Sequence, residues 1–143
     1  MADTLLVLSG MGVPDWSARG LEQTLAPIAA SVSMRRRVSD GALIDLSASY
    51  LRKYGSTIIC RDLRSPALEG IFPGAVVTVD CVAELAYETM TGSPARPVVA
   101  GSERVEGGFT FYRPQLIMRV AGWRLTVDEW GARVGWELDL EEV

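Results

Sequence analysis

Residues 133–140 read Arg-Val-Gly-Trp-Glu-Leu-Asp-Leu, and this stretch decides the fold class. Its apolar side chains fall on every second position, and the positions between them carry glycine or a charged side chain. Successive side chains of a β-strand point to opposite faces. The stretch therefore predicts an amphipathic strand with one buried face and one solvated face.

The same period of two runs through residues 57–61, 75–85, 109–112, 115–120 and 123–127. Alternation of this kind is typical of half-buried strands. We expect strands near residues 4–8, 22–28, 33–38, 42–46, 56–61, 75–87, 97–104, 109–120, 122–128 and 132–140. Their spacing of roughly ten residues, with frequent turns, predicts a mainly β fold, a small β-barrel or β-sandwich of antiparallel strands.

Turn residues support this fold. Asp40-Gly41 separates two strand-like runs, and Asp-Gly in that position is a strong hairpin signal. Pro114 lies inside a strand-like run, where we expect a sheet edge, a bulge or a bend from one sheet to another.

One short helix at most is expected, near residues 65-70. Ser65 can cap it, Pro66 suits its first position and Gly70 would end it. No linker rich in Gly or Ser divides the chain. We therefore expect residues 1-143 to form a single β domain, with the N-terminal segment 1-20 as a candidate extended arm.

Composition excludes several classes of chemistry. The chain has 143 residues, 14 Lys+Arg, 18 Asp+Glu, a formal charge of −4 and no histidine. Without histidine, Ser-His-Asp and Cys-His catalysis and most catalytic zinc sites are excluded. Cys60 and Cys81 are too far apart for a CxxC motif, and we expect them to be free, buried thiols in a reducing cytosol. No cofactor or metal is predicted.

The N-terminus lacks the signature of a targeting segment. Asp3 is its first charge, and the apolar run 5–8 ends at Ser9-Gly10. A signal peptide would begin with a basic region, and a membrane span needs about 20 apolar residues. We expect neither.

Carboxylates near the C-terminus are the first candidates for acid-base chemistry: Glu137, Asp139, Glu141 and Glu142. Glu137 and Asp139 fall on the polar face of an amphipathic strand, where solvated carboxylates are expected. Gly10-Met11-Gly12 matches neither of the glycine-rich phosphate-loop patterns. We predict no catalytic residue and no enzyme activity.

Three consecutive arginines, Arg35 to Arg37, form the sharpest charge feature. In a strand, Arg35 and Arg37 would share one face and Arg36 would lie on the other. They are interpreted first as a ridge that contacts a protein partner. Solvent exposure beside the Asp-Gly turn and contact with nucleic-acid phosphates are the alternatives.

The four tryptophans divide into two groups. Trp16 lies in a loop and Trp130 at a hairpin tip, and exposed aromatic residues at such places are often interface anchors or sugar-stacking platforms. Trp123 and Trp136 fit strand interiors, where we expect them to pack in the core.

Several stretches together resemble a known group of proteins: residues 12–21 (GVPDWSARGL), 23–28 (QTLAPI), 45–47 (DLS), 52–54 (RKY), and Pro73-Gly74 ahead of residues 77–81 (VTVDC). They resemble small structural proteins encoded by the tail genes of tailed double-stranded DNA bacteriophages, namely baseplate, tube-initiator or hub-associated components with small β domains. The resemblance runs from about Gly12 to the C-terminal Glu-Glu-Val.

The resemblance implies a non-enzymatic virion protein, assembled in several copies around the tail axis in the host bacterial cytoplasm. Its partners would be further copies of itself in a ring and other phage tail proteins. No membrane is implied, and nucleic acid would enter only as genomic DNA passing through a tail bore. The alternative function is a carbohydrate-binding β module for receptor or cell-wall recognition, and a small hydrolase is the third.

The segregation of charge suggests how copies would meet. Arg35 and Arg37 lie early in the chain, whereas Glu141 and Glu142 would extend past the last strand as a free acidic tail. We expect the two groups to pair between copies, with apolar contacts around Trp16 or Trp130. Such head-to-tail contacts close into rings when the rotation permits.

Overall fold

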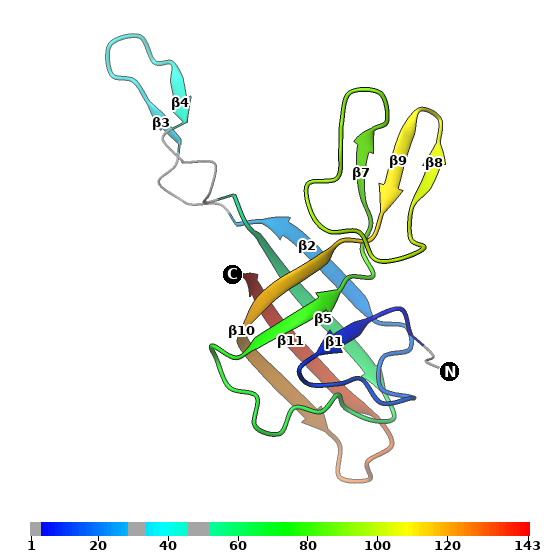
Figure 1. Cartoon of the computed structure of the whole chain (residues 1–143). Helices are drawn as coiled ribbons and strands as arrows, with labels where there is room; N and C mark the ends of the chain where they lie inside the picture. The colour runs from blue at the N-terminus through cyan, green and yellow to red at the C-terminus, as the bar shows by residue number, and fades with distance from the viewer. Residues whose placement is uncertain (1–3, 29–33, 46–51) are drawn as a thin grey trace.

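Antiparallel strands make up the fold, and no helix occurs in the residues that the computed structural model describes, which are 4–28, 34–45 and 52–143. The strands are β1 (Val7–Ser9), β2 (Glu22–Pro27), β3 (Met34–Arg36), β4 (Leu43–Asp45), β5 (Tyr54–Asp62), β6 (Val76–Asp80), β7 (Leu85–Glu88), β8 (Arg104–Glu106), β9 (Phe109–Tyr112), β10 (Gln115–Val127) and β11 (Val134–Glu142). They form a six-stranded sheet, β1-β6-β10-β11-β5-β2, a three-stranded sheet, β7-β9-β8, and the β3-β4 hairpin (Figure 1). The prediction of a mainly β, antiparallel fold is confirmed.

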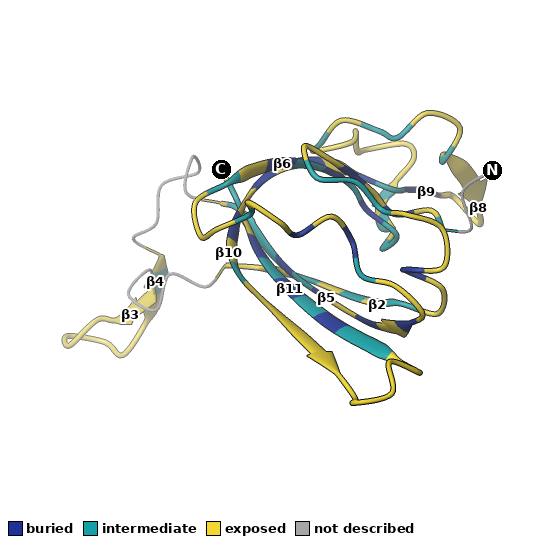
Figure 2. Ribbon diagram, turned by 90° about the horizontal axis from the view of Figure 1, so that it is seen from below, coloured by how far each residue is buried: buried dark blue, intermediate teal, exposed yellow. Residues whose placement is uncertain are grey.

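The six-stranded sheet curls around the core of the protein (Figure 2). Every strand of the sheet turns one set of alternate side chains inward, as the period of two predicts. The innermost side chains come from β1, β5, β6, β10 and β11: Leu8, Ile58, Cys60, Val77, Val79, Leu116, Met118, Val120, Trp136, Leu138 and Leu140. A single curled sheet therefore supplies most of its own core, in a barrel-like arrangement.

A side chain of β2, one edge strand of this curled sheet, links it to the segment that follows β6. The Oε1 atom of Gln23 accepts hydrogen bonds from the backbone N–H groups of Val82 (2.7 Å) and Ala83 (3.1 Å), just beyond β6. Its amide nitrogen donates to the hydroxyl of Ser56 on β5, at 3.1 Å. Because β2 and β6 are not neighbours in the sheet, this amide bridges an opening that no strand pairing closes.

Several predicted strand boundaries are wrong. The expected strand 75–87 divides into β6 and β7, because the chain bends at residues 81–84 and passes into the small sheet. The expected strand 97–104 is reduced to an isolated bridge between Val98 and Pro114, and β8 begins only at Arg104. Pro114 lies between β9 and β10, where the chain changes sheets, which is one of the places expected for it.

The expected strands 109–120 and 122–128 are also divided differently. β9 ends before Pro114, and β10 continues through residue 121 to Val127. A register shift between Val120 and Gly122 marks a β-bulge, which inserts one extra residue opposite β11.

The candidate helix near residues 65-70 does not form, which agrees with the prediction of one short helix at most. The backbone N–H of Ala67 donates to the carbonyl of Gly12 at 3.1 Å, and Leu68 is buried. This segment therefore hydrogen-bonds to the N-terminal loop instead of forming a helical turn. An extended N-terminal arm is not found in residues 4–20 either. β1 pairs with β6, and Leu6, Leu8 and Ala18 are buried in the core.

Two adjacent residues of β10 test the assignment of faces. Leu116 is 1% exposed and Ile117 is 56% exposed. We expect Leu116→Ala to lower the free energy of unfolding by about 2–5 kcal/mol, because it leaves a cavity in the core. Ile117→Ala should lower the free energy of unfolding by less than about 1 kcal/mol, because measured strand propensities span only about that range. Urea denaturation of both variants measures the difference, and equal losses would contradict the inward face of β10.

Candidate assembly surfaces

The β3-β4 hairpin is built around the predicted Asp40-Gly41 turn. Gly41 adopts a φ of 72°, which glycine tolerates without strain, and its N–H donates to the carbonyl of Arg37 at 2.8 Å. The carboxylate of Asp40 accepts the N–H of Ala42 at 3.0 Å. This local geometry confirms the hairpin predicted from the Asp-Gly pair.

The hairpin stands away from the rest of the protein (Figure 1). Among the described strands, β3 and β4 contact only one another. Met34 and Leu43 are exposed, and Val38 is as exposed as in an extended chain (103%). An isolated two-stranded hairpin of this kind is marginally stable in water.

The hairpin is also basic, as the sequence indicates. Register places Arg35 opposite Ile44 and Arg36 opposite Leu43, so Arg35 and Arg36 point to opposite faces. The guanidinium of Arg37 forms an ion pair with Asp40 at 3.4 Å. The cationic ridge and the exposed apolar side chains therefore belong to one projecting element.

A partly buried ion pair holds the root of this projecting segment. β2 and β5 pair as far as Pro27 and Tyr54, and beyond them the N–H of Ile28 donates to the carbonyl of Lys53 at 2.8 Å. Glu142 accepts the N–H of Tyr54 at 3.0 Å and the guanidinium of Arg96 at 2.6 and 3.0 Å. We call Arg96, Glu142 and Tyr54 the root clasp.

The root clasp corrects the expectation of a free acidic tail. β11 runs to Glu142, so Glu141 and Glu142 lie inside the last strand and not beyond it. Glu142 is directed to Arg96 of its own chain, whereas Glu141 is exposed and opposite Arg119 in the β10-β11 register. Burial tends to raise the pKa of Glu142, but the hydrogen bonds from Arg96 and Tyr54 outweigh it and lower the pKa below its ordinary value of 4.5.

This pKa shift makes the contribution of Glu142 depend on pH. A carboxyl group whose pKa is lower in the folded protein stabilises it above the ordinary pKa, and that stability is lost as the pH falls through the folded pKa. We expect Glu142→Gln to lower the free energy of unfolding by about 1–3 kcal/mol at pH 7 and by progressively less toward pH 3. Glu141→Gln is the matched control and should have little effect at either pH. Thermal or urea unfolding across this range measures both, and a loss independent of pH would contradict the clasp.

The second half of β10 forms an unpaired strand edge. β6 pairs with β10 only along residues 115–119, whereas β11 pairs with β10 as far as Val127. Residues 122–127 therefore have β11 on one side and no strand on the other, within the described part of the chain. We call this segment the free edge; its apolar side chains are all exposed, Trp123, Leu125 and Val127.

The exposure of Trp123 was not expected. Trp123 lies opposite the buried Leu138, so its ring is on the inward face of the sheet. Its indole N–H donates to the carbonyl of Ile71 at 2.6 Å, but Trp123 remains 37% exposed because the inner face is incompletely covered beyond β6. Trp136 is 2% exposed, which confirms the prediction for that residue.

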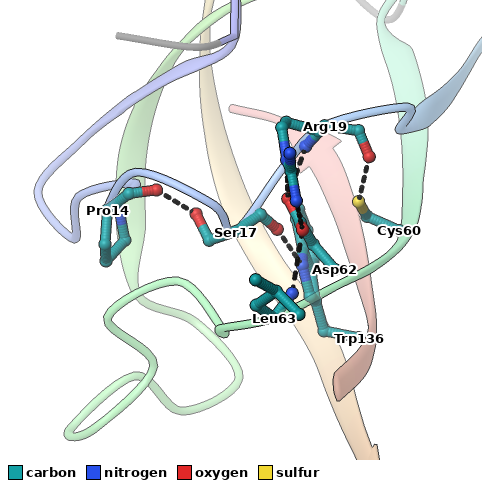
Figure 3. A network of polar contacts seen from close by, with 7 residues as sticks. All are labelled: Pro14, Ser17, Arg19, Cys60, Asp62, Leu63 and Trp136. Atoms are coloured by element: carbon teal, nitrogen blue, oxygen red, sulfur yellow. Dashed lines mark hydrogen bonds and ion pairs between the residues drawn. The ribbon is translucent and has the colours of Figure 1, made fainter. Parts of the chain in front are cut away.

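The loop that carries Trp16 is fixed by a network of polar contacts (Figure 3). The carboxylate of Asp62 on β5 accepts the backbone N–H of Arg19 at 2.9 Å and its guanidinium at 2.9 Å. The indole N–H of Trp136 donates to the carbonyl of Ser17 at 2.7 Å. The guanidinium of Arg19 also lies 4.1 Å from the ring centre of Trp16, so one face of this exposed ring is occupied by the chain's own cation.

Asp62 is the central group of this network. Its side chain is 4% exposed, and the hydrogen bond from the Arg19 side chain is the largest cause that lowers its pKa below 3.8. We expect Asp62→Asn to lower the free energy of unfolding by about 1–3 kcal/mol at pH 7, because the charge and one acceptor oxygen are lost. Asp15→Asn, in the exposed part of the same loop, is the control. Equal melting temperatures for the two variants would show that the network does not stabilise the loop.

Trp130 lies in the turn between β10 and β11 and is 88% exposed. The turn is held by Asp128, whose carbonyl accepts the N–H of Gly131 at 3.1 Å and whose carboxylate accepts that of Ala132 at 3.0 Å. A surface hollow of about 330 Å³ lies between this turn and the end of β5, lined by Arg61, Asp62, Leu63, Ala132 and Arg133. The Trp16 loop contacts the same end of β5, since the N–H of Leu63 donates to the Trp16 carbonyl at 3.1 Å.

The remaining candidate groups have local partners. Glu137 forms an ion pair with Arg124 at 3.1 Å, and Asp139 accepts the Thr57 hydroxyl at 3.0 Å. In residues 4–28, 34–45 and 52–143, no group of three metal-ligating side chains comes together, and no helix is long and apolar enough to cross a membrane.

Cys60 and Cys81 are buried and not bonded to each other, and burial is the largest cause that raises the pKa of each thiol to about 11. The Cys60 thiol also donates to the carbonyl of Arg19 at 3.3 Å. Both thiols are therefore expected to react slowly at neutral pH.

The proposed interface residues occupy three separate places. Arg35 and Arg37 lie on the hairpin, Glu141 and Glu142 at one end of β11, and Trp16 and Trp130 near the opposite end.

The free edge and Arg96 were not among the predicted site residues. The alternating pattern of 122–128 indicated a strand but not where its neighbour ends, and Arg96 stands alone in a loop.

Comparison with known proteins gives no match, either to a protein-family model, to a curated protein or to a solved structure.

Proposed function

We propose that this chain is a non-enzymatic structural subunit of a phage tail, placed in the baseplate, hub or tube-initiation region and assembled in several copies around the tail axis. The observation that carries the proposal is the β3-β4 hairpin, which contacts no other described strand and exposes Met34, Val38 and Leu43. A projecting apolar element of this kind suits a subunit whose surface is completed by its neighbours.

Two further observations support an assembling subunit. The free edge of β10 exposes unpaired backbone together with apolar side chains, a combination that monomeric proteins usually protect. The support for a phage tail in particular is the resemblance, inferred from short stretches between Gly12 and Cys81, to tail structural proteins.

Assembly and membership of a tail are tested separately. We expect the purified chain to sediment as a defined oligomer at micromolar concentration, and to be found by mass spectrometry in tail particles purified from cells that express it with its neighbouring genes. Raised salt should weaken the oligomer only in part, because exposed charges are screened within about 10 Å at 0.1 M while apolar contacts are not. A chain that stays monomeric at all concentrations and is missing from the particles would overturn the proposal.

Carbohydrate binding is the second candidate. The observation in its favour is that the Trp16 loop and the Trp130 turn flank the polar hollow at the end of β5. A glycan array decides between the two functions. Retention that is lost in Trp130→Ala, by a chain that remains monomeric, would favour the binding module over the tail subunit.

A further inference from the structure

We propose that the β3-β4 hairpin of one copy adds to the free edge of β10 in a second copy, extending its six-stranded sheet. This inference rests on the proposed function, since it names the surface through which subunits would meet. Both elements present an edge that pairs with no other strand in the described part of the chain: the hairpin along residues 34–36 and 43–44, and β10 along residues 122–127. Strand addition satisfies both sets of backbone groups at once.

The position of the two elements requires a second copy. The hairpin segment leaves the body beside Tyr54 and Gly55, and Gly55 pairs with Glu141 near the end of β11. The free edge ends at Val127, opposite Val134 at the other end of β11. Seven residues of strand separate Val134 from Glu141, or about 24 Å, and the hairpin projects away from the free edge (Figure 1). The two elements of one chain therefore face opposite directions.

The side chains of the two elements are complementary. Met34 and Leu43 on the hairpin are exposed apolar groups, as are Leu125 and Val127 on the free edge. Adding a strand would bring such side chains side by side on the sheet, where cross-strand apolar pairs contribute about 0.2–1 kcal/mol each.

The charges favour the same arrangement. The hairpin carries Arg35 and Arg36, besides Arg37, which pairs with Asp40 of the same hairpin. The turn that follows the free edge begins with Asp128 and Glu129. The positive charge within the free edge is already balanced, because Arg124 forms an ion pair with Glu137 at 3.1 Å. These surface charges would set the register and the encounter rate, while the backbone and apolar contacts supply most of the affinity.

The symmetry of the contact follows from its geometry. Each copy offers a hairpin at one end and an acceptor edge at the other, so the contact is heterologous and leaves both surfaces available to further copies. Such contacts close into a ring or continue as a filament, according to the rotation between neighbours. The same contact can therefore build an assembly without a second type of interface.

Disulfide cross-linking between separate chains tests the contact. One chain carries Leu43→Cys and the other Leu125→Cys, and the two are mixed and oxidised. Cys60 and Cys81 are buried, with thiol pKa values of about 11, so the introduced thiols should react first. We expect a mixed disulfide dimer at least tenfold more abundant than with Ile117→Cys, an exposed control on the paired half of β10.

A second measurement separates this contact from assembly in general. Leu125→Lys should weaken the oligomer at least tenfold in sedimentation equilibrium, whereas Ile117→Lys should not, with equal melting temperatures showing that both fold. If the wild-type chain assembles but Leu125→Lys assembles equally well and no cross-link exceeds the control, the hairpin contact is wrong while the subunit function stands. If the wild-type chain does not assemble at all, the proposed function fails as well.

Discussion

The antiparallel pairing of β10 with β11 is the contact on which the rest of the structure depends. β11 connects β10 to β5 and β2, so one ladder joins the two halves of the six-stranded sheet. The same ladder places Val120, Leu138 and Leu140 on one inward face. The bulge adds one residue to β10 between Val120 and Gly122. The inward face of β10 therefore passes from even-numbered to odd-numbered residues, and Trp123 lies opposite the inward-facing Leu138.

The unequal lengths of the strands create the exposed surfaces. β10 has 13 residues and β6 only five, so β6 cannot cover the whole of its neighbour. The chain that leaves β6 goes instead to build the small sheet through Cys81, and the second half of β10 keeps one partner. A monomer would gain by covering Leu125 and Val127, and their exposure is understandable if another chain covers them.

The sequence predicted those features that depend on neighbouring residues alone. Alternation in residues 133–140 predicted β11, and Asp40-Gly41 predicted the hairpin, because both rest on local geometry. The split of the strand expected at 75–87 and the exposure of Trp123 depend on where a distant strand ends, which a period of two does not encode. Glu142 was misplaced for the same reason: its polarity suggested a solvated tail, and its partner Arg96 lies 46 positions away.

The root clasp connects the stability of the body with the proposed contact. The clasp fixes Tyr54 through Glu142 and the carbonyl of Arg52 through Arg96, at 3.0 Å in each case. The chain that returns from the hairpin is therefore held by the end of the same β11 strand that supports the free edge. A fixed departure point restricts where the hairpin can reach, and so lowers the entropy lost when a neighbour captures it. The hairpin arginines can contribute only a little binding energy each, because exposed ion pairs are weak. A fixed root lets them select the orientation of the hairpin without also having to position its base.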